Sequence, residues 1–167
     1  VPLEDFWFTF SATYFTVMVF QAVFLRDTPT INTAQLKMAG GLITALLAVF
    51  LWLYTNHVAF LRIPYYYAWL LFLVFVVPAI LLVRYWPRYR SPLVVLTLYF
   101  FVLMFPYELT ADYLGFWTFP SNEYLGMLNV WGFRFPLEEF FAWIVFFPVA
   151  AIAFTEFVTG RHASSSG

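Results

Sequence analysis

Two short acidic stretches are the parts of this chain best suited to proton chemistry. Residues 2–6 and 136–140 both read Pro-Leu-Glu-acid-Phe, and each stretch opens a long apolar run. Proline fits the first turn of a helix, and the free N–H groups of that turn favour charged carboxylates. Burial beside Phe, Trp and Leu favours the neutral form, and two adjacent carboxyls cannot both ionise cheaply. The pattern therefore predicts a coupled set of acids, some of which hold a proton near neutral pH.

The repetition of the stretch argues for more than helix capping. Asp and Glu are common in the first turn of any helix, so capping would explain a single stretch of this kind. Here the same pattern recurs 134 positions later, again at the start of an apolar run. The candidate acids are Glu4, Asp5, Glu138 and Glu139.

A further acidic pair, Glu108 and Asp112, precedes the second stretch. The two residues are four apart, which places them on one face if a helix continues through both. Like charges repel mildly at this spacing, so helix stability gives little reason for the pair. A frayed helix end that faces water is the alternative explanation.

The elements that must position these acids follow from composition. The chain of 167 residues is 63% hydrophobic and 10% charged, whereas an ordinary soluble domain carries roughly a quarter charged residues. Such a chain lacks the polar cover that a water-soluble globule needs. Five runs approach the roughly 20 apolar residues that cross a bilayer, namely 6–25, 38–54, 65–83, 92–109 and 137–158. The predicted fold is all-α, a polytopic transmembrane helical bundle in which Pro78 and Pro148 kink the third and fifth spans.

Several kinds of chemistry are excluded by what the chain lacks. It has no cysteine and two histidines, which rules out disulfides, thiolate metal sites and a Cys nucleophile and leaves too few ligands for a histidine metal cage. It has no Gly-x-Gly-x-x-Gly fingerprint for a dinucleotide. The net charge of −1 with scattered basic residues gives no footprint for nucleic acid. The sequence therefore predicts no metal, no cofactor and no nucleic-acid partner.

The distribution of Lys and Arg predicts how the spans are oriented. One side holds six of these residues, which are Arg26, Lys37, Arg84, Arg88, Arg90 and Arg161. The other side holds Arg62 and Arg134, so the positive-inside rule places the first side in the cytoplasm. Seven of the nine acids collect on the non-cytoplasmic side, namely Glu4, Asp5, Glu108, Asp112, Glu123, Glu138 and Glu139.

The order of motifs along the second half resembles a known family. Glu108 lies seven residues before Gly115, and the segments Trp117-Thr118-Phe119-Pro120 and Leu125-Gly126 follow. Residues 135–141 then read Phe-Pro-Leu-Glu-Glu-Phe-Phe. This order resembles the signature of the membrane-integral, non-flavin lycopene cyclase domain, which occurs as heterodimeric cyclases in bacteria and as fused chains in archaea and fungi. The resemblance covers about a fifth of the chain, and Glu108 stands where the family more often carries Asp.

The resemblance implies a domain organisation. The family's domain is duplicated, so residues 1–160 would form a transmembrane cyclase-like domain, with 1–25 as the tail of a first repeat and 38–160 as the second. Residues 161–167 would be a tail, or a linker or tag remnant. The implied setting is a bacterial or archaeal cell membrane, with a related cyclase subunit as a partner in a homo- or hetero-oligomer.

The resemblance also implies a reaction. A linear ψ end of a lycopene-like polyene, dissolved in the bilayer, is protonated and closes to a ring without net redox change. Glu138 or Glu139 would be the general acid, Glu4 or Asp5 its counterpart in the other repeat, and Glu108 the base or a nearby charge. The aromatic faces would stabilise the carbocation. The predicted substrate-binding residues are Trp117, Phe119, Phe140, Phe141 and Asp112.

Other functions fit the same residues. A carotenoid hydratase or a cyclase of C50 carotenoids would use the same proton chemistry. A carotenoid-binding membrane subunit would need no chemistry at all. A small transporter would use acids as proton relays, but such acids are expected near mid-membrane and these lie at the ends of the spans.

Overall fold

Five helices are long and apolar enough to cross a membrane, by length and composition. The computed structural model describes residues 3–25, 31–116, 118–119 and 123–159, and for residues 3–6 only the backbone. The five candidate spans are Trp7–Phe24, Thr33–Asn56, Tyr66–Tyr85, Pro87–Tyr113 and Leu137–Thr159. Each overlaps one predicted span, so the prediction of a mostly helical chain with five apolar spans is confirmed. This is compatible with a membrane protein.

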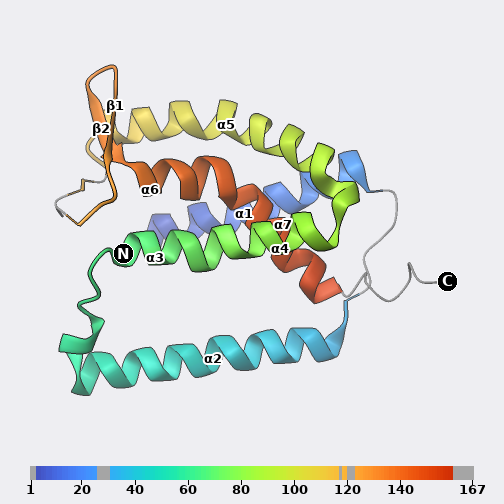
Figure 1. Cartoon of the computed structure of the whole chain (residues 1–167), viewed down its shortest axis with the longest axis horizontal. Coiled ribbons are helices and arrows are strands. Elements are labelled where there is room, and N and C mark those ends of the chain that lie inside the picture. Colours follow the sequence, from blue (N-terminus) through green and yellow to red (C-terminus); the bar gives the residue numbers. More distant parts are fainter. Residues whose placement is uncertain (1–2, 26–30, 117, 120–122, 160–167) are drawn as a thin grey trace.

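The described elements follow one another as long helices, with a single β-hairpin between the last two spans (Figure 1). The α-helices are α1 Leu3–Phe24, α2 Thr33–Asn56, α3 Tyr66–Leu70, α4 Val77–Tyr85, α5 Arg90–Tyr113, α6 Leu137–Glu139 and α7 Phe147–Thr159. Short 3₁₀ turns are η1 Val58–Leu61 and η3 Pro87–Tyr89, and π-helical segments are η2 Leu71–Val76 and η4 Phe140–Phe146. The strands are β1 Met127–Val130 and β2 Phe133–Pro136.

A π-helical segment precedes each of the two prolines that were predicted to disturb a span. The segment η2 ends at Val76, two residues before Pro78. The segment η4 ends at Phe146, two residues before Pro148. Proline has no N–H to donate, and its ring clashes with the carbonyl four residues earlier. A wider turn just before the proline gives the ring room. The third and fifth spans therefore continue as helices through their prolines.

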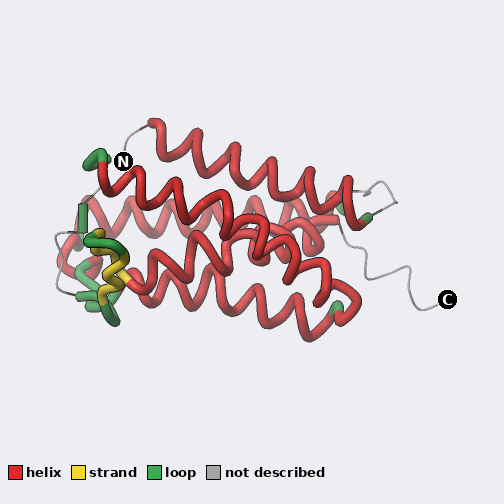
Figure 2. The backbone as a smooth tube through the Cα atoms, turned by 90° about the horizontal axis from the view of Figure 1, so that it is seen from above, coloured by secondary structure: helices red, strands yellow, loops and turns green. Residues whose placement is uncertain are grey.

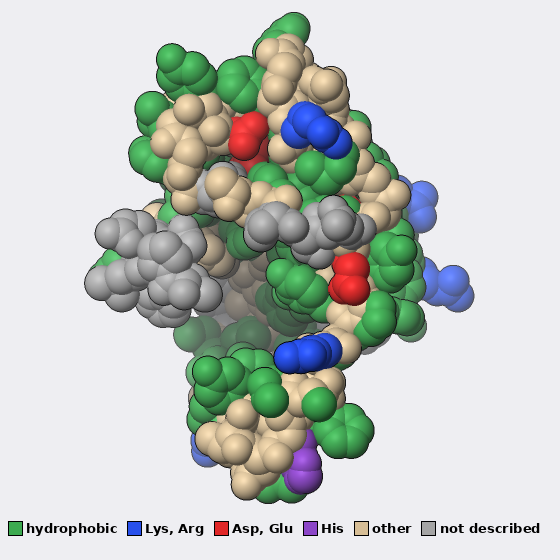
Figure 3. Space-filling model, turned by 90° about the vertical axis from the view of Figure 1, so that its left-hand side faces the viewer, with side chains coloured by type: hydrophobic (Ala, Val, Ile, Leu, Met, Phe, Trp, Pro, Cys, Tyr) green, Lys and Arg blue, Asp and Glu red, His purple; other side chains and the backbone are tan. Residues whose placement is uncertain are grey.

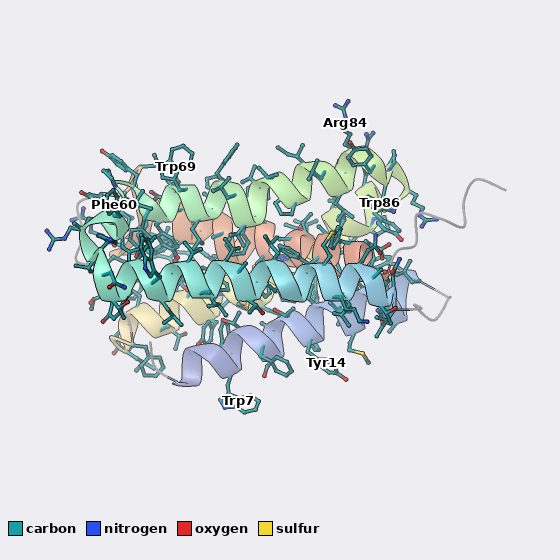
Figure 4. The ribbon with its side chains drawn as sticks, turned by 90° about the horizontal axis from the view of Figure 1, so that it is seen from below. Trp7, Tyr14, Phe60, Trp69, Arg84 and Trp86 are labelled. Carbon is teal, nitrogen blue, oxygen red and sulfur yellow. The ribbon has the colours of Figure 1, made fainter. Side chains whose placement is uncertain are left out.

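The last span is the centre of the bundle. Half of its apolar window is buried, whereas none of the window of α2 is. Helix α7 packs against α1, α4 and α5, and its Ile152 joins Phe20, Leu82 and Leu96 in the core. The helices run along a common axis (Figure 2). Large apolar side chains face outward, among them Trp7 and Tyr14 on α1 (Figure 4), as expected where lipid is the solvent.

The β-hairpin was not predicted. Strands β1 and β2 pair antiparallel, with Met127 opposite Pro136 and Val130 opposite Phe133. The turn residues Trp131 and Gly132 have φ angles of 53° and 93°. Two central residues with positive φ are typical of the tight turn whose twist matches a hairpin. The hairpin leads directly into α6 and so sets where the second acidic stretch begins.

The hairpin end of the bundle is also its acidic end. Helices α1 and α6 begin at this end of the bundle, and helix α5 ends at it (Figure 1). Both acidic helix starts and the Glu108–Asp112 pair therefore lie at one end, as the order of the spans predicts. Lys37 and the arginines around the η3 turn lie at the opposite end, whereas Arg26 and Arg161 lie outside the described residues.

Candidate functional site

Glu138 is held by the loop that precedes the hairpin. Its side chain is 0% exposed, and its Oε1 accepts a hydrogen bond of 2.6 Å from the backbone N–H of Leu125. The backbone N–H of Leu137 donates to the carbonyl of Gly126 at 2.9 Å, which fixes the start of α6 against the same loop. The other carboxyl oxygen, Oε2, is buried and has no hydrogen-bond partner among the described residues. One oxygen of Glu138 is thus anchored, and the other is available to a ligand or proton.

Glu139 is in a different environment, although it is the next residue. Its side chain is 8% exposed and has no hydrogen-bond partner within the described part of the chain. Trp143 follows four residues later, about one helical turn along the same span. The Trp143 ring contacts Phe75 and Phe147 with centroid distances of 5.8 and 5.4 Å, and its Nε1–H donates to the hydroxyl of Tyr67 at 3.2 Å. Glu139 therefore stands one turn before an aromatic wall.

Glu108 is the third buried carboxyl at this end. It is 5% exposed on α5, a helix that packs against η4 and β2. Helix α5 continues to Tyr113, so Asp112 lies one turn further on the same face, as predicted, and is half-buried. Because Glu108 is buried and Asp112 is half-buried, the pair does not fit a frayed helix end that faces water.

Four phenylalanines form a cluster beside the acids, which we call the acid-end aromatic cluster and which consists of Phe101, Phe105, Phe140 and Phe141. The ring of Phe140 lies edge-on to Phe101 and Phe105, with centroid distances of 6.3 Å to each. Phe141 contacts Phe140 at 5.5 Å. Two of the predicted aromatic residues are thus brought together next to Glu139, with two from α5 that were not predicted.

The other predicted residues are placed less fully. Phe119 contacts Tyr124 edge-on at 6.3 Å and belongs to the loop rather than to the acid-end aromatic cluster. Trp117 lies outside the described residues. Glu4 and Asp5 lie in the first turn of α1, and their side chains are outside the described part of the structure.

A long cavity of about 650 Å³ begins close to both acidic helix starts. It lies between α1, η2 and the η4–α7 span, and its wall includes Thr9, Gln21, Phe75, Trp143 and Phe147. Thr9 and Gln21 are separated by 12 residues of one helix, or about 18 Å at 1.5 Å per residue. We call this space the long cavity.

Two of the candidate acids lie close in sequence to residues that line the long cavity. Asp5 precedes Thr9 by four residues, and Glu139 precedes Trp143 by four, so each lies about one turn before a residue of the cavity wall. Seen end-on, the acidic face carries acidic side chains among hydrophobic ones and is hollowed near its centre (Figure 3). The volume is within the range of sites that hold a small molecule, and its shape suits an elongated apolar one.

A buried carboxyl at the opposite end was missed. Glu156 on α7 is 1% exposed, and its Oε2 accepts a hydrogen bond of 3.2 Å from the hydroxyl of Tyr89. The guanidinium of Arg88 donates to that hydroxyl at 3.2 Å and lies 4.9 Å above the tyrosine ring. A lone acid inside an apolar run was the available signal, because such residues are rarely unpaired in a membrane span.

The chemistry that these groups can perform is proton transfer to an apolar molecule. Among the described residues, no three His, Cys, Asp or Glu side chains are grouped so that they could hold a metal ion. What the acidic end offers instead is buried carboxyls, aromatic faces and an elongated, largely apolar space. No family model, no curated protein and no solved structure matches this chain.

Proposed function

We propose that this chain cyclises the linear end groups of carotenoids and that Glu139 donates the proton that starts the reaction. The resemblance of the motifs to the lycopene cyclase domain suggests the substrate class. The observation that carries the proposal is the position of Glu139, which is buried, without a hydrogen-bond partner among the described residues, and one turn from the long cavity.

The two adjacent glutamates suit different roles. Glu138 accepts a hydrogen bond from the Leu125 backbone N–H through Oε1, so the loop holds its side chain in place even though Oε2 has no described partner. It is a positioning residue that fixes the start of α6 and hence the direction of Glu139. A general acid needs freedom to reach the atom that it protonates, and Glu139 has that freedom with respect to the described residues, none of which bonds to it.

The reaction balances without a cofactor. The proton of Glu139 adds to the terminal double bond of the polyene, and the neighbouring double bond attacks the resulting tertiary cation to close the ring. A ring proton then leaves to a base and forms the ring double bond, so atoms and electrons are conserved. Glu108, buried on the helix that packs against η4, is our candidate for that base.

Aromatic rings line the path that the cation would take. Phe75, Trp143 and Phe147 form part of the wall of the long cavity, and Phe140 directly follows Glu139 in the chain. An aromatic face stabilises a desolvated cation by about 2 kcal/mol. Exclusion of water from an apolar cavity also prevents capture of the cation as an alcohol. We extend the proposal to Glu4 or Asp5 as the acid of a second, repeat-related site.

The test is expression of the chain in cells that accumulate lycopene, followed by chromatography and mass spectrometry of the pigments. Cyclic products with the mass of lycopene are expected. A product heavier by one water would support a hydratase instead. Pigment that co-purifies with the chain but is unchanged would support a carotenoid-binding subunit.

The acids are tested in the same cells. The double variant Glu138→Gln/Glu139→Gln is expected to accumulate linear substrate at normal protein levels. The matched control is Glu123→Gln, which changes an exposed acid at the same end. Ring formation by the double variant would refute the assignment of the acid.

A further inference from the structure

A second groove, on the outside of the bundle, combines an apolar length with a basic end. It has a volume of about 660 Å³ and lies between α4 and α5, with Val145, Phe146 and Val149 of the last span as its floor. Arg84 and Arg90 belong to its wall, and none of the described acidic residues does. These arginines lie on either side of the η3 turn that joins the two helices. The groove therefore has hydrocarbon along its length and positive charge at one end.

The two arginines are available to a ligand. Within the described residues, neither side chain has an ion pair or a hydrogen bond, and both are exposed. Arg88 in the same turn differs, because it is engaged by the Tyr89 hydroxyl and ring. Arg84 projects outward at the end of α4, away from the bundle (Figure 4). Guanidinium groups bind phosphate oxygens through paired hydrogen bonds.

We infer that this groove binds an anionic phospholipid, with its phosphate at Arg84 and Arg90 and an acyl chain along α4 and α5. A basic pocket between membrane helices is the form that anionic lipid sites take. An inorganic anion would use the arginines but not the apolar length, and a zwitterionic lipid would use the length but gain little from two positive charges. The inference is independent of any reaction at the acidic end.

The first part of the test asks whether the charge of the headgroup matters, by comparing two lipids that have the same acyl chains. Native mass spectrometry of the detergent-solubilised chain measures binding of dioleoyl phosphatidylglycerol and dioleoyl phosphatidylcholine. Two juxtamembrane charges predict about 30-fold tighter binding of the anionic lipid. The variant Arg84→Gln/Arg90→Gln is expected to lose this preference. Arg62→Gln/Arg134→Gln, which removes the same charge from the acidic end, is expected to keep it.

The second part of the test asks whether an acyl chain occupies the groove. Val94 lines the groove and is 60% exposed, whereas Val102 on the same helix is 67% exposed and lies outside the groove wall. Val94→Trp is expected to weaken binding of the anionic lipid at least tenfold, and Val102→Trp to leave it unchanged. No preference in the unmodified chain, a preference that survives Arg84→Gln/Arg90→Gln, undiminished binding of the anionic lipid by Val94→Trp, or equal competition by inorganic phosphate would each overturn the inference.

Discussion

Both ends of the last span bury carboxyls, and the bonds of Glu156 at one end differ from those of Glu139 at the other. Near the end of α7, Glu156 accepts a hydrogen bond from Tyr89, which Arg88 supports from the other side. At the start of the span, Glu139 is buried without a hydrogen-bond partner among the described residues. Both carboxyls are costly to bury. Only the first is compensated by a described bond, and for this reason we propose Glu139, and not Glu156, as the reactive acid.

Under the proposed function, the two ends have different roles. The bonds among Arg88, Tyr89 and Glu156 tie the turn between α4 and α5 to the central helix, which is a structural role. The acidic end instead buries Glu139 without a hydrogen-bond partner among the described residues, about one turn before Trp143 in the wall of the long cavity. Substitutions at one end should change activity and those at the other should change stability.

The largest expected effect is on turnover at the acidic end. Glu139→Gln keeps the size of the side chain but removes the exchangeable acidic proton, so ring formation should fall at least 100-fold, the usual range for loss of a general acid. Thermal stability should change little, because no described bond is lost. Ring formation is measured per folded molecule in lycopene-containing vesicles. Turnover near that of the unmodified chain would mean that Glu139 is as structural as Glu156.

The next effect is on stability at the opposite end. Tyr89→Phe removes the hydroxyl that donates to Glu156 and accepts from Arg88, and a buried group that loses a partner costs about 1–3 kcal/mol. The midpoint of thermal unfolding should fall while turnover per folded molecule stays constant. Tyr14→Phe, at an exposed tyrosine on α1, is the matched control. A loss of turnover without a loss of stability would break the division between the two ends.

A smaller effect is expected in the acid-end aromatic cluster. Phe140→Leu keeps an apolar side chain after Glu139 but removes the ring, and loss of one aromatic contact of about 2 kcal/mol to the cation predicts about a 30-fold decrease in turnover. The exposed Phe60 provides the control Phe60→Leu. Equal turnover in the two variants would show that the ring only fills space.

The smallest effect concerns the hairpin that positions α6. Gly132 has a φ of 93°, and an alanine there meets no neighbouring atom but is strained in its backbone, which predicts a cost of about 1 kcal/mol. Gly126→Ala is the control, because that position is equally open and no left-handed φ is recorded for it. Thermal unfolding of the two variants gives the comparison. Equal stability would mean that the turn adapts freely and does not constrain the start of α6.

The spans were predictable because length and hydropathy report directly on helices that cross a membrane. The prolines predicted where the third and fifth spans are disturbed, but the π-helical form depends on packing around them. The hairpin was missed because its ten residues sit in a stretch rich in aromatic residues and turn on Trp131, a residue that seldom adopts a positive φ.

The sequence indicated which residues belong to the candidate site, but not which role each of them has. The repeated stretch singled out Glu138 and Glu139 together. Which of them is anchored depends on the loop at Leu125, which folds back over the start of α6 and lies 13 residues away in the chain. Glu156 shows the same limit, because its partner Tyr89 comes from 67 residues earlier. Such long-range bonds leave no local pattern in the sequence.

Cyclisation in heavy water tests most directly whether a protein acid starts the reaction. The chain is reconstituted with lycopene in vesicles in D₂O, and the products are analysed by mass spectrometry. We expect each ring to carry one deuterium and no added oxygen, and Glu139→Gln to yield almost no ring. Unlabelled rings, or labelled rings formed as fast by Glu139→Gln as by the unmodified chain, would contradict the proposed role of Glu139.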